Sequence, residues 1–126
     1  MRQSIVFFIV LLLVILFGFW ELSYLDESSK YFMSDINNTY QTAMRGEYSV
    51  AENEGKNIKE MWKNLRKTWA LFINDGEIDR IDESITSFVS CIKTQSDDDI
   101  VKEYYVLISQ IKHAVEFQKV KVENVF

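Results

Sequence analysis

Residues 5–20 read IVFFIVLLLVILFGFW, a run of sixteen residues that contains no charge and is apolar on every face of a helix. Sixteen helical residues rise about 24 Å, whereas the hydrocarbon core of a bilayer is about 30 Å thick. Adding Ser4 and continuing to Leu25 gives a helix of roughly 33 Å. A buried core helix is a poor alternative, because so small a chain has too little other apolar mass to surround it. We therefore predict that residues 1–25 form a transmembrane anchor.

The ends of this run bear on whether the anchor is retained. Arg2 suits the positive start of a cleaved signal peptide, but no small-x-small cleavage site follows the run, where residues 19–22 read FWEL. Trp20 and Tyr24 suit the interfacial layer of a membrane. An uncleaved anchor is therefore favoured over a signal peptide.

The orientation follows from few charges. Arg2 precedes the run, and the first positive residue after it is Lys30. Because Lys and Arg beside a span favour the cytoplasm, we expect a single pass through the cell membrane, with the amino terminus cytoplasmic and the folded domain outside.

The rest of the chain is acidic. The sequence has 14 Lys and Arg against 19 Asp and Glu, a net charge of −5, and Arg2 is the only charged residue before Glu21. Nucleic-acid binding needs a basic face that neutralises phosphates, so we expect no nucleic-acid partner. Cys91 is the only cysteine, which excludes an intrachain disulfide and a cysteine-based metal site.

Four helical patterns follow one another, separated by short turn signals and without a proline. The first continues the anchor as one rod to about Met44, before the stop at Arg45-Gly46. The second begins with the capping-box sequence of residues 49–52 and ends at residues 74–76, which read NDG. The third ends by residue 95, and Ser96 is the expected N-cap of the fourth.

Apolar residues recur at steps of three and four in each pattern, which predicts one buried face per helix. Short turns between such helices favour antiparallel neighbours. The expected fold is all-α: a single N-terminal transmembrane helix followed by a small antiparallel bundle of three to four helices over residues 26–118. Val120 and Val122 alternate with charged residues, so we expect residues 119–126 to form a short extended tail that Val125 and Phe126 dock in a groove. The buried faces expected are Leu25, Ser29, Phe32, Ile36, Tyr40 and Ala43; Ala51, Gly55, Ile58, Trp62, Leu65, Trp69 and Phe72; Ile78, Ile81, Ile85, Phe88 and Ile92; and Ile100, Tyr104, Leu107, Ile111 and Val115.

Candidate catalytic residues are few. His113 is the only histidine, and a lone histidine cannot build a histidine-based metal cluster. Glu77 and Asp79 are two residues apart and do not share a helix face. The adjacent acids of residues 97–99 are better explained by helix capping than by calcium binding, which needs acids at alternate positions. We expect no catalytic centre, no metal and no cofactor, and therefore no enzyme.

A basic strip lies along one side of the second pattern, within about 100° of the helix. Ion pairs with the acidic start of the third helix are the favoured account of this strip. The alternative is a docking surface for an acidic partner or for phospholipid headgroups. The strip consists of Lys56, Lys59, Lys63, Arg66 and Lys67.

A more specific pattern joins the second and third helices. It reads Trp62-x-x-Leu65-x-x-x-Trp69, then LFIN at residues 71–74 and Glu77-Ile-Asp79-x-Ile at residues 77–81. With the anchor and the ending NVF, it resembles, over nearly the whole chain, a family of uncharacterised proteins from Gram-positive bacteria catalogued as domain of unknown function 4363.

The family pattern carries a histidine near the end of the last helix, which His113 matches. It often carries a second one in the turn before the Glu-Ile-Asp segment, where this chain has Asp75. The resemblance implies a single-pass membrane protein with a small helical domain, in some cases beside a multi-pass membrane protein. Asn74 belongs to the same motif. The resemblance implies no activity.

The expected function is a non-enzymatic, membrane-anchored domain that binds the lipid bilayer and another membrane protein or a second copy of the chain. The alternative is an extracytoplasmic sensor that binds a small ligand in a pocket of the bundle beside its tryptophans.

Overall fold

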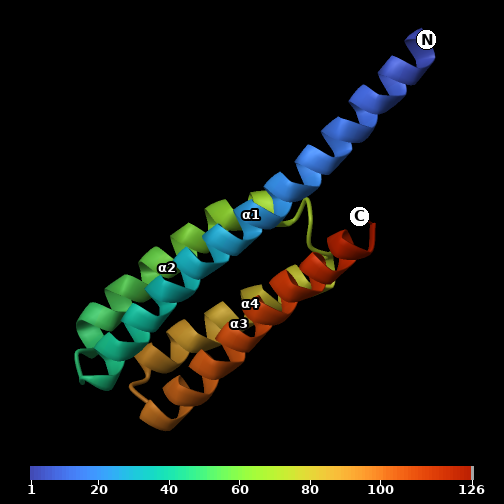
Figure 1. Ribbon diagram of the computed structural model, residues 1–126. Coiled ribbons are helices and arrows are strands. Elements are labelled where there is room, and N and C mark those ends of the chain that lie inside the picture. The colour runs from blue at the N-terminus through green and yellow to red at the C-terminus, as the bar shows by residue number, and fades with distance from the viewer. Residues whose placement is uncertain (126) are drawn as a thin grey trace.

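The computed structural model describes residues 1–125 and contains four helices, joined by short connections into an up-and-down bundle (Figure 1). They are α1 (Arg2–Met44), α2 (Tyr48–Trp69), α3 (Asp75–Lys93) and α4 (Asp97–Val125). Helix α1 packs against α2 and α4, and α3 packs against the same two helices on the opposite side. The expected all-α fold with a small bundle is confirmed.

Helix α1 is one uninterrupted helix of 43 residues, as the absence of a breaker predicted. Its first half projects beyond the bundle in Figure 1, and its second half is the first helix of the bundle. The first buried residue along it is Gly18. Among the described residues, α1 is the one helix long and apolar enough to cross a membrane, and a signal sequence near an amino terminus would meet the same criterion.

The predicted faces of the bundle lie against the core, although four of their residues are only half-buried: Tyr40, Leu65, Phe72 and Tyr104. On α1, Leu25, Phe32 and Ile36 are fully buried, and on α3 the isoleucines and Phe88 are buried in the same core. At the centre, the ring of Phe32 stacks on Trp62 with centroids 5.8 Å apart, and Trp69 meets both rings edge-on. The heptad-like seam of α2 therefore supplies large aromatic side chains to the core.

Helix α2 differs from the prediction at both ends. It begins at Tyr48, with Glu47 at the N-cap position and no side-chain capping bond, so the predicted capping box of residues 49–52 does not form. It ends at Trp69 rather than at residues 74–76. The reason is that Asn74 starts the next helix instead of ending this one: its side-chain oxygen accepts a hydrogen bond from the Glu77 amide and caps α3.

The predicted extended tail is wrong, because α4 continues as a helix to Val125. The buried stripe of this helix runs through Ile111, Val115, Gln118 and Val122, at the helical steps of four and three. The polar residue Gln118 interrupts the apolar pattern, so the sequence did not show that the helix continues. In the structure, Gln118 is buried and donates a hydrogen bond to Glu21 of α1. The predicted docking of Val125 and Phe126 lies outside the described side chains.

Candidate functional site

Glu77 is the most enclosed acidic residue of the motif that joins α2 and α3. The side chain of Asn74 accepts a hydrogen bond from the Glu77 amide at 3.0 Å and so fixes the start of α3. A carboxylate in the first turn of a helix is stabilised by the unpaired backbone N–H groups there. The sequence therefore places a buried acid at a helix amino terminus, at the end of the bundle nearest the projecting part of α1 (Figure 1).

The Glu77 carboxylate joins α3 to α4. One oxygen accepts a hydrogen bond from the Arg80 guanidinium at 2.7 Å, and the other lies 3.4 Å from Nδ1 of His113. The His113 side chain is 64 % exposed, whereas that of Glu77 is 9 % exposed. The structure thus brings together Asn74, Glu77 and His113, three of the motif residues, across two helices.

This cluster has limited chemical capacity. An ionised carboxylate can only accept, so in this contact the donor is the N–H at Nδ1 of His113. Within the described residues, no hydroxyl or thiol group forms a hydrogen bond with the ring, and its neighbour on α4 is the ring of Phe117. No group of three or more acids, histidines or cysteines among these residues could hold a metal ion.

The tryptophans of the motif are structural. Trp62 donates from its indole nitrogen to the Asp82 carboxylate of α3, and Trp69 donates to the Ser28 hydroxyl of α1 at 3.1 Å. Both rings are buried in the packed core.

The basic strip pairs with α3 at only one residue. Arg66 lies 3.1 Å from Asp82 and 3.7 Å from Asp79. These pairs confirm the favoured account for Arg66 and place Asp79 on the exposed surface. Within the described part of the chain, the four lysines of the strip form no salt bridge and are exposed; they are Lys56, Lys59, Lys63 and Lys67.

A groove between α1 and α2 was not foreseen from the sequence. We call it the α1–α2 groove; its volume is about 470 Å³ and it opens beside Leu65, the half-buried member of the motif. Its walls are mostly aromatic and aliphatic, and Tyr31 is exposed at its rim. Each helix contributes only part of the lining, so the apolar pattern of neither α1 nor α2 predicted the groove. It is lined by Tyr24, Glu27, Ser28, Tyr31, Met61 and Leu65.

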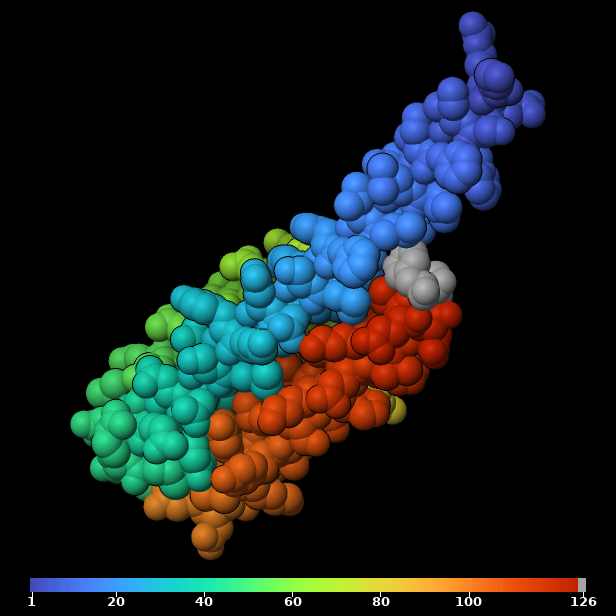
Figure 2. Space-filling model, viewed as in Figure 1, coloured from blue at the N-terminus to red at the C-terminus, as the bar shows by residue number. Residues whose placement is uncertain are grey.

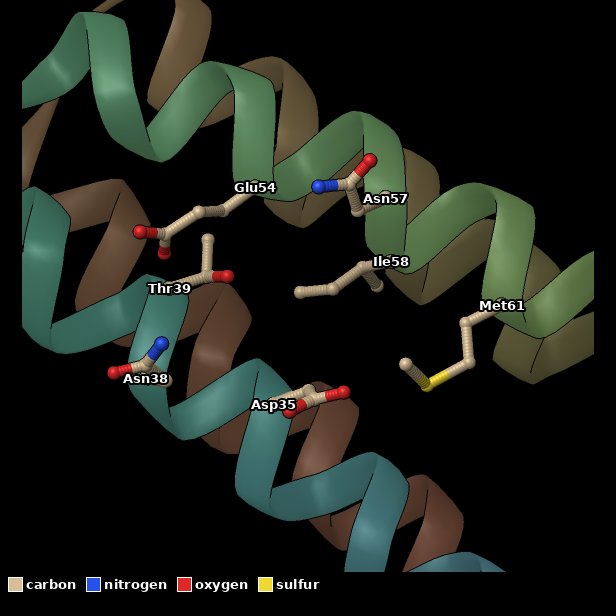
Figure 3. Close-up of a pocket in the computed structure, with 7 residues that line it drawn as sticks. All are labelled: Asp35, Asn38, Thr39, Glu54, Asn57, Ile58 and Met61. Carbon is tan, nitrogen blue, oxygen red and sulfur yellow. The ribbon is translucent and has the colours of Figure 1, made fainter.

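A smaller polar cleft lies farther along the same two helices and holds about 180 Å³ (Figure 3). In Figure 3, the carboxylate of Glu54 points from α2 toward Thr39 of α1. One Glu54 oxygen accepts a hydrogen bond from Thr42 at 3.2 Å, whereas the other is buried and has no hydrogen-bond partner among the described residues. The cleft is lined by Asp35, Asn38, Thr39, Glu54, Asn57, Ile58 and Met61.

Polar contacts tie α4 to α1 near the end of the bundle. Asp26 accepts from Lys119 at 2.8 Å and pairs with Lys30 at 3.0 Å. The hydrogen bond from Lys119, and then that from Lys30, lowers the pKa of the Asp26 carboxyl below its ordinary value. Elsewhere, burial raises the pKa of the Cys91 thiol, which packs against the core as expected.

Comparison with known proteins identifies the family alone. No curated protein and no solved structure matches the chain. A family model does match, over residues 19–125, and so covers the whole bundle with its Trp62–His113 motif. The chain therefore belongs to the family described as a domain of unknown function (DUF4363).

Proposed function

We propose that this protein is a single-pass membrane protein whose bundle, held outside the cytoplasm, binds another membrane protein without catalysing a reaction. The observation that carries the proposal is the continuity of α1. The exposed apolar part and the first helix of the bundle form one helix, so the span would hold the bundle at a fixed distance from the bilayer. A domain held close to the bilayer is within reach of other proteins of the same membrane, which makes such a protein the favoured partner.

The α1–α2 groove is the proposed contact surface. Aromatic residues and methionine are enriched at protein interfaces, and the groove presents Tyr24, Tyr31 and Met61 beside Leu65. Tyr31 is 68 % exposed, although its neighbour Phe32 on the same helix is fully buried. The groove is on the half of α1 nearest the projecting segment, within reach of a partner anchored in the same bilayer.

Photo-crosslinking in native membranes tests this proposal. A benzophenone amino acid is placed at Tyr31, in the groove, and in a second variant at Tyr105, an equally exposed tyrosine of α4 outside it. We expect an adduct with a second membrane protein from position 31 and none from position 105.

Two results would count against it. Free monomer from both variants would remove the partner. An adduct that contains only a second copy of the chain would replace the heterologous partner by a homo-oligomer.

A sensor of a small cationic ligand is the second candidate. What favours it is the buried Glu54 oxygen that lacks a hydrogen-bond partner in the polar cleft. A buried carboxylate oxygen without a donor is costly, and an ammonium group would supply one. The cleft is smaller than the 300 Å³ or more of ordinary ligand pockets, which restricts the ligand to a small amine.

Intrinsic tryptophan fluorescence distinguishes this candidate, because Met61 of the cleft adjoins Trp62 in the chain. Titration of small amines should shift the emission of the native protein, and Glu54→Gln should abolish the shift. Unchanged emission across the amines would exclude a sensor of this kind.

A further inference from the structure

The part of α1 that is free of the bundle is too short to cross a bilayer by itself. Residues 2–17 are exposed or half-exposed, and burial begins at Gly18. Sixteen helical residues span about 24 Å, whereas a hydrocarbon core of about 30 Å needs some 20 residues. If α1 spans the membrane as proposed above, roughly four more residues, to about Glu21, must lie within the core.

The bundle already contacts α1 at this level, through the α2–α3 connection and through α4. The ring of Phe72, in the connection between α2 and α3, lies 5.9 Å from the rings of both Phe17 and Trp20. From the other side, Gln118 of α4 donates a hydrogen bond to Glu21. In Figure 2, the end of α4 lies against the base of the projecting helix. These parts of the bundle cannot remain in water if residues 18–21 are in the membrane.

The surface at this end has the character of a membrane interface. Leu71 is 76 % exposed in the connection beside Phe72, and Phe117 and Val120 are each more than half exposed on α4. Trp20 is also half exposed, and its ring stacks on Tyr24. Exposed aliphatic side chains are unfavourable in water, while tryptophan and tyrosine favour the interfacial layer.

Glu21, the acid of α1 at this level, has its own hydrogen-bond partner. Glu21 is 6 % exposed, and Gln118 donates to its carboxylate. Burying a carboxylate in a low-dielectric layer is costly, and the hydrogen bond from Gln118 lowers that cost for Glu21.

We infer that the base of the bundle is itself a membrane-binding surface: the α2–α3 connection at Leu71 and Phe72, and α4 at Phe117 and Val120, sit in the outer interface of the bilayer. This inference rests on the proposed span of α1. Its partner is the lipid bilayer around that span, and its consequence is that the bundle has no flexible neck between it and the membrane.

Spin-label accessibility in vesicles of dioleoylphosphatidylcholine tests the depth of each site. The full chain carries Cys91→Ser and one added cysteine, at Leu71 or at Val120, both exposed positions where a label need not disturb the core. Val50→Cys, half exposed at the far end of the bundle, is the aqueous control, and Leu11→Cys, in the apolar run, is the lipid control. Circular dichroism checks that each labelled chain keeps its helices.

We expect labels at positions 71 and 120 to lose access to a water-soluble nickel chelate, relative to position 50, and to gain access to oxygen, as at position 11. Labels at 71 and 120 that match position 50, while position 11 is in lipid, would overturn the inference and leave the span intact. If position 11 also matches position 50, the span itself fails, and the inference fails with it.

Discussion

The Glu77 carboxylate shows how one motif residue can serve the fold at two places. It occupies the amino terminus of α3 behind the Asn74 cap, and it contacts both Arg80 and His113. Replacing it with Ala should lower the free energy of unfolding by about 1 kcal/mol, because the loss of a helix-terminal charge adds to the loss of partly exposed ion pairs. Urea unfolding in detergent, followed by circular dichroism, measures the change.

Asp79 is the matched control, since it lies two residues away on the exposed side of the same turn. Asp79→Ala should change the free energy of unfolding by less than about 0.5 kcal/mol. Equal losses from the two variants would mean that the buried contacts of Glu77 add nothing.

Asp26 should make part of the stability depend on acid pH. Lys119 and Lys30 hold its pKa in the folded chain below its ordinary value, which is the value it returns to on unfolding. Its contribution is therefore complete above the unfolded pKa and is lost as the pH falls through the folded pKa. In Asp26→Asn, the loss of thermal stability from pH 4 downward should be smaller than in the native chain. Superimposable pH profiles would contradict this account.

At the scale of the helices, periodicity predicted the buried faces because an apolar stripe repeats every 3.6 residues whatever the helix packs against. The predictions failed at places where a single polar residue determines whether a helix starts or continues. Ser49 matched a capping box, yet the chain turns at Gly46, with φ of +82°, and enters α2 at Tyr48. Gln118 interrupts an apolar stripe that continues to Val122. Its burial could not be predicted, because its hydrogen-bond partner Glu21 is 97 residues away in the sequence. The contact of Glu77 with His113 is also between residues far apart in the sequence. The sequence pattern therefore singled out both residues but did not predict that they would be in contact.

The contact between α2 and α3 is limited by Gly55. A Cβ atom there would lie 3.3 Å from both methyl groups of Val89, closer than ordinary packing allows. Gly55→Leu should therefore destabilise the protein by about 2 kcal/mol through overpacking. Adding Val89→Ala should restore much of this loss, because it frees space for the new side chain. Thermal melts of the single and double variants give the comparison, and additive losses would contradict a shared contact.

The connection between α3 and α4 holds Gln95 in the left-handed region, at φ of 57°. Its amide donates to the Ile92 carbonyl and the Ser96 amide to the Cys91 carbonyl, the pattern of a helix end that favours glycine. Gln95→Gly should stabilise the protein by about 1 kcal/mol, because it removes the strain of a side chain in this conformation. A lower melting temperature for this variant would show that the side chain contributes contacts that outweigh the strain.

For the whole molecule, the central feature is that the apolar amino-terminal segment and the first helix of the bundle form one helix. Two of the three helices that follow pack directly on it, and its buried residues begin at Gly18. A bundle built in this way would follow any tilt of the span rigidly. If α1 spans the membrane and a partner binds in the α1–α2 groove, as proposed, we expect that binding to be coupled to the orientation of α1 in the membrane.

Maleimide labelling of intact cells tests this account most directly. In a Cys91→Ser background, Lys93→Cys lies at the far end of the bundle and Gln3→Cys at the start of α1, both exposed. A membrane-impermeant maleimide should label position 93 in intact cells and position 3 only after permeabilisation, with both proteins in the membrane fraction. Labelling in the opposite order, or a soluble protein that lacks its first two dozen residues, would contradict it.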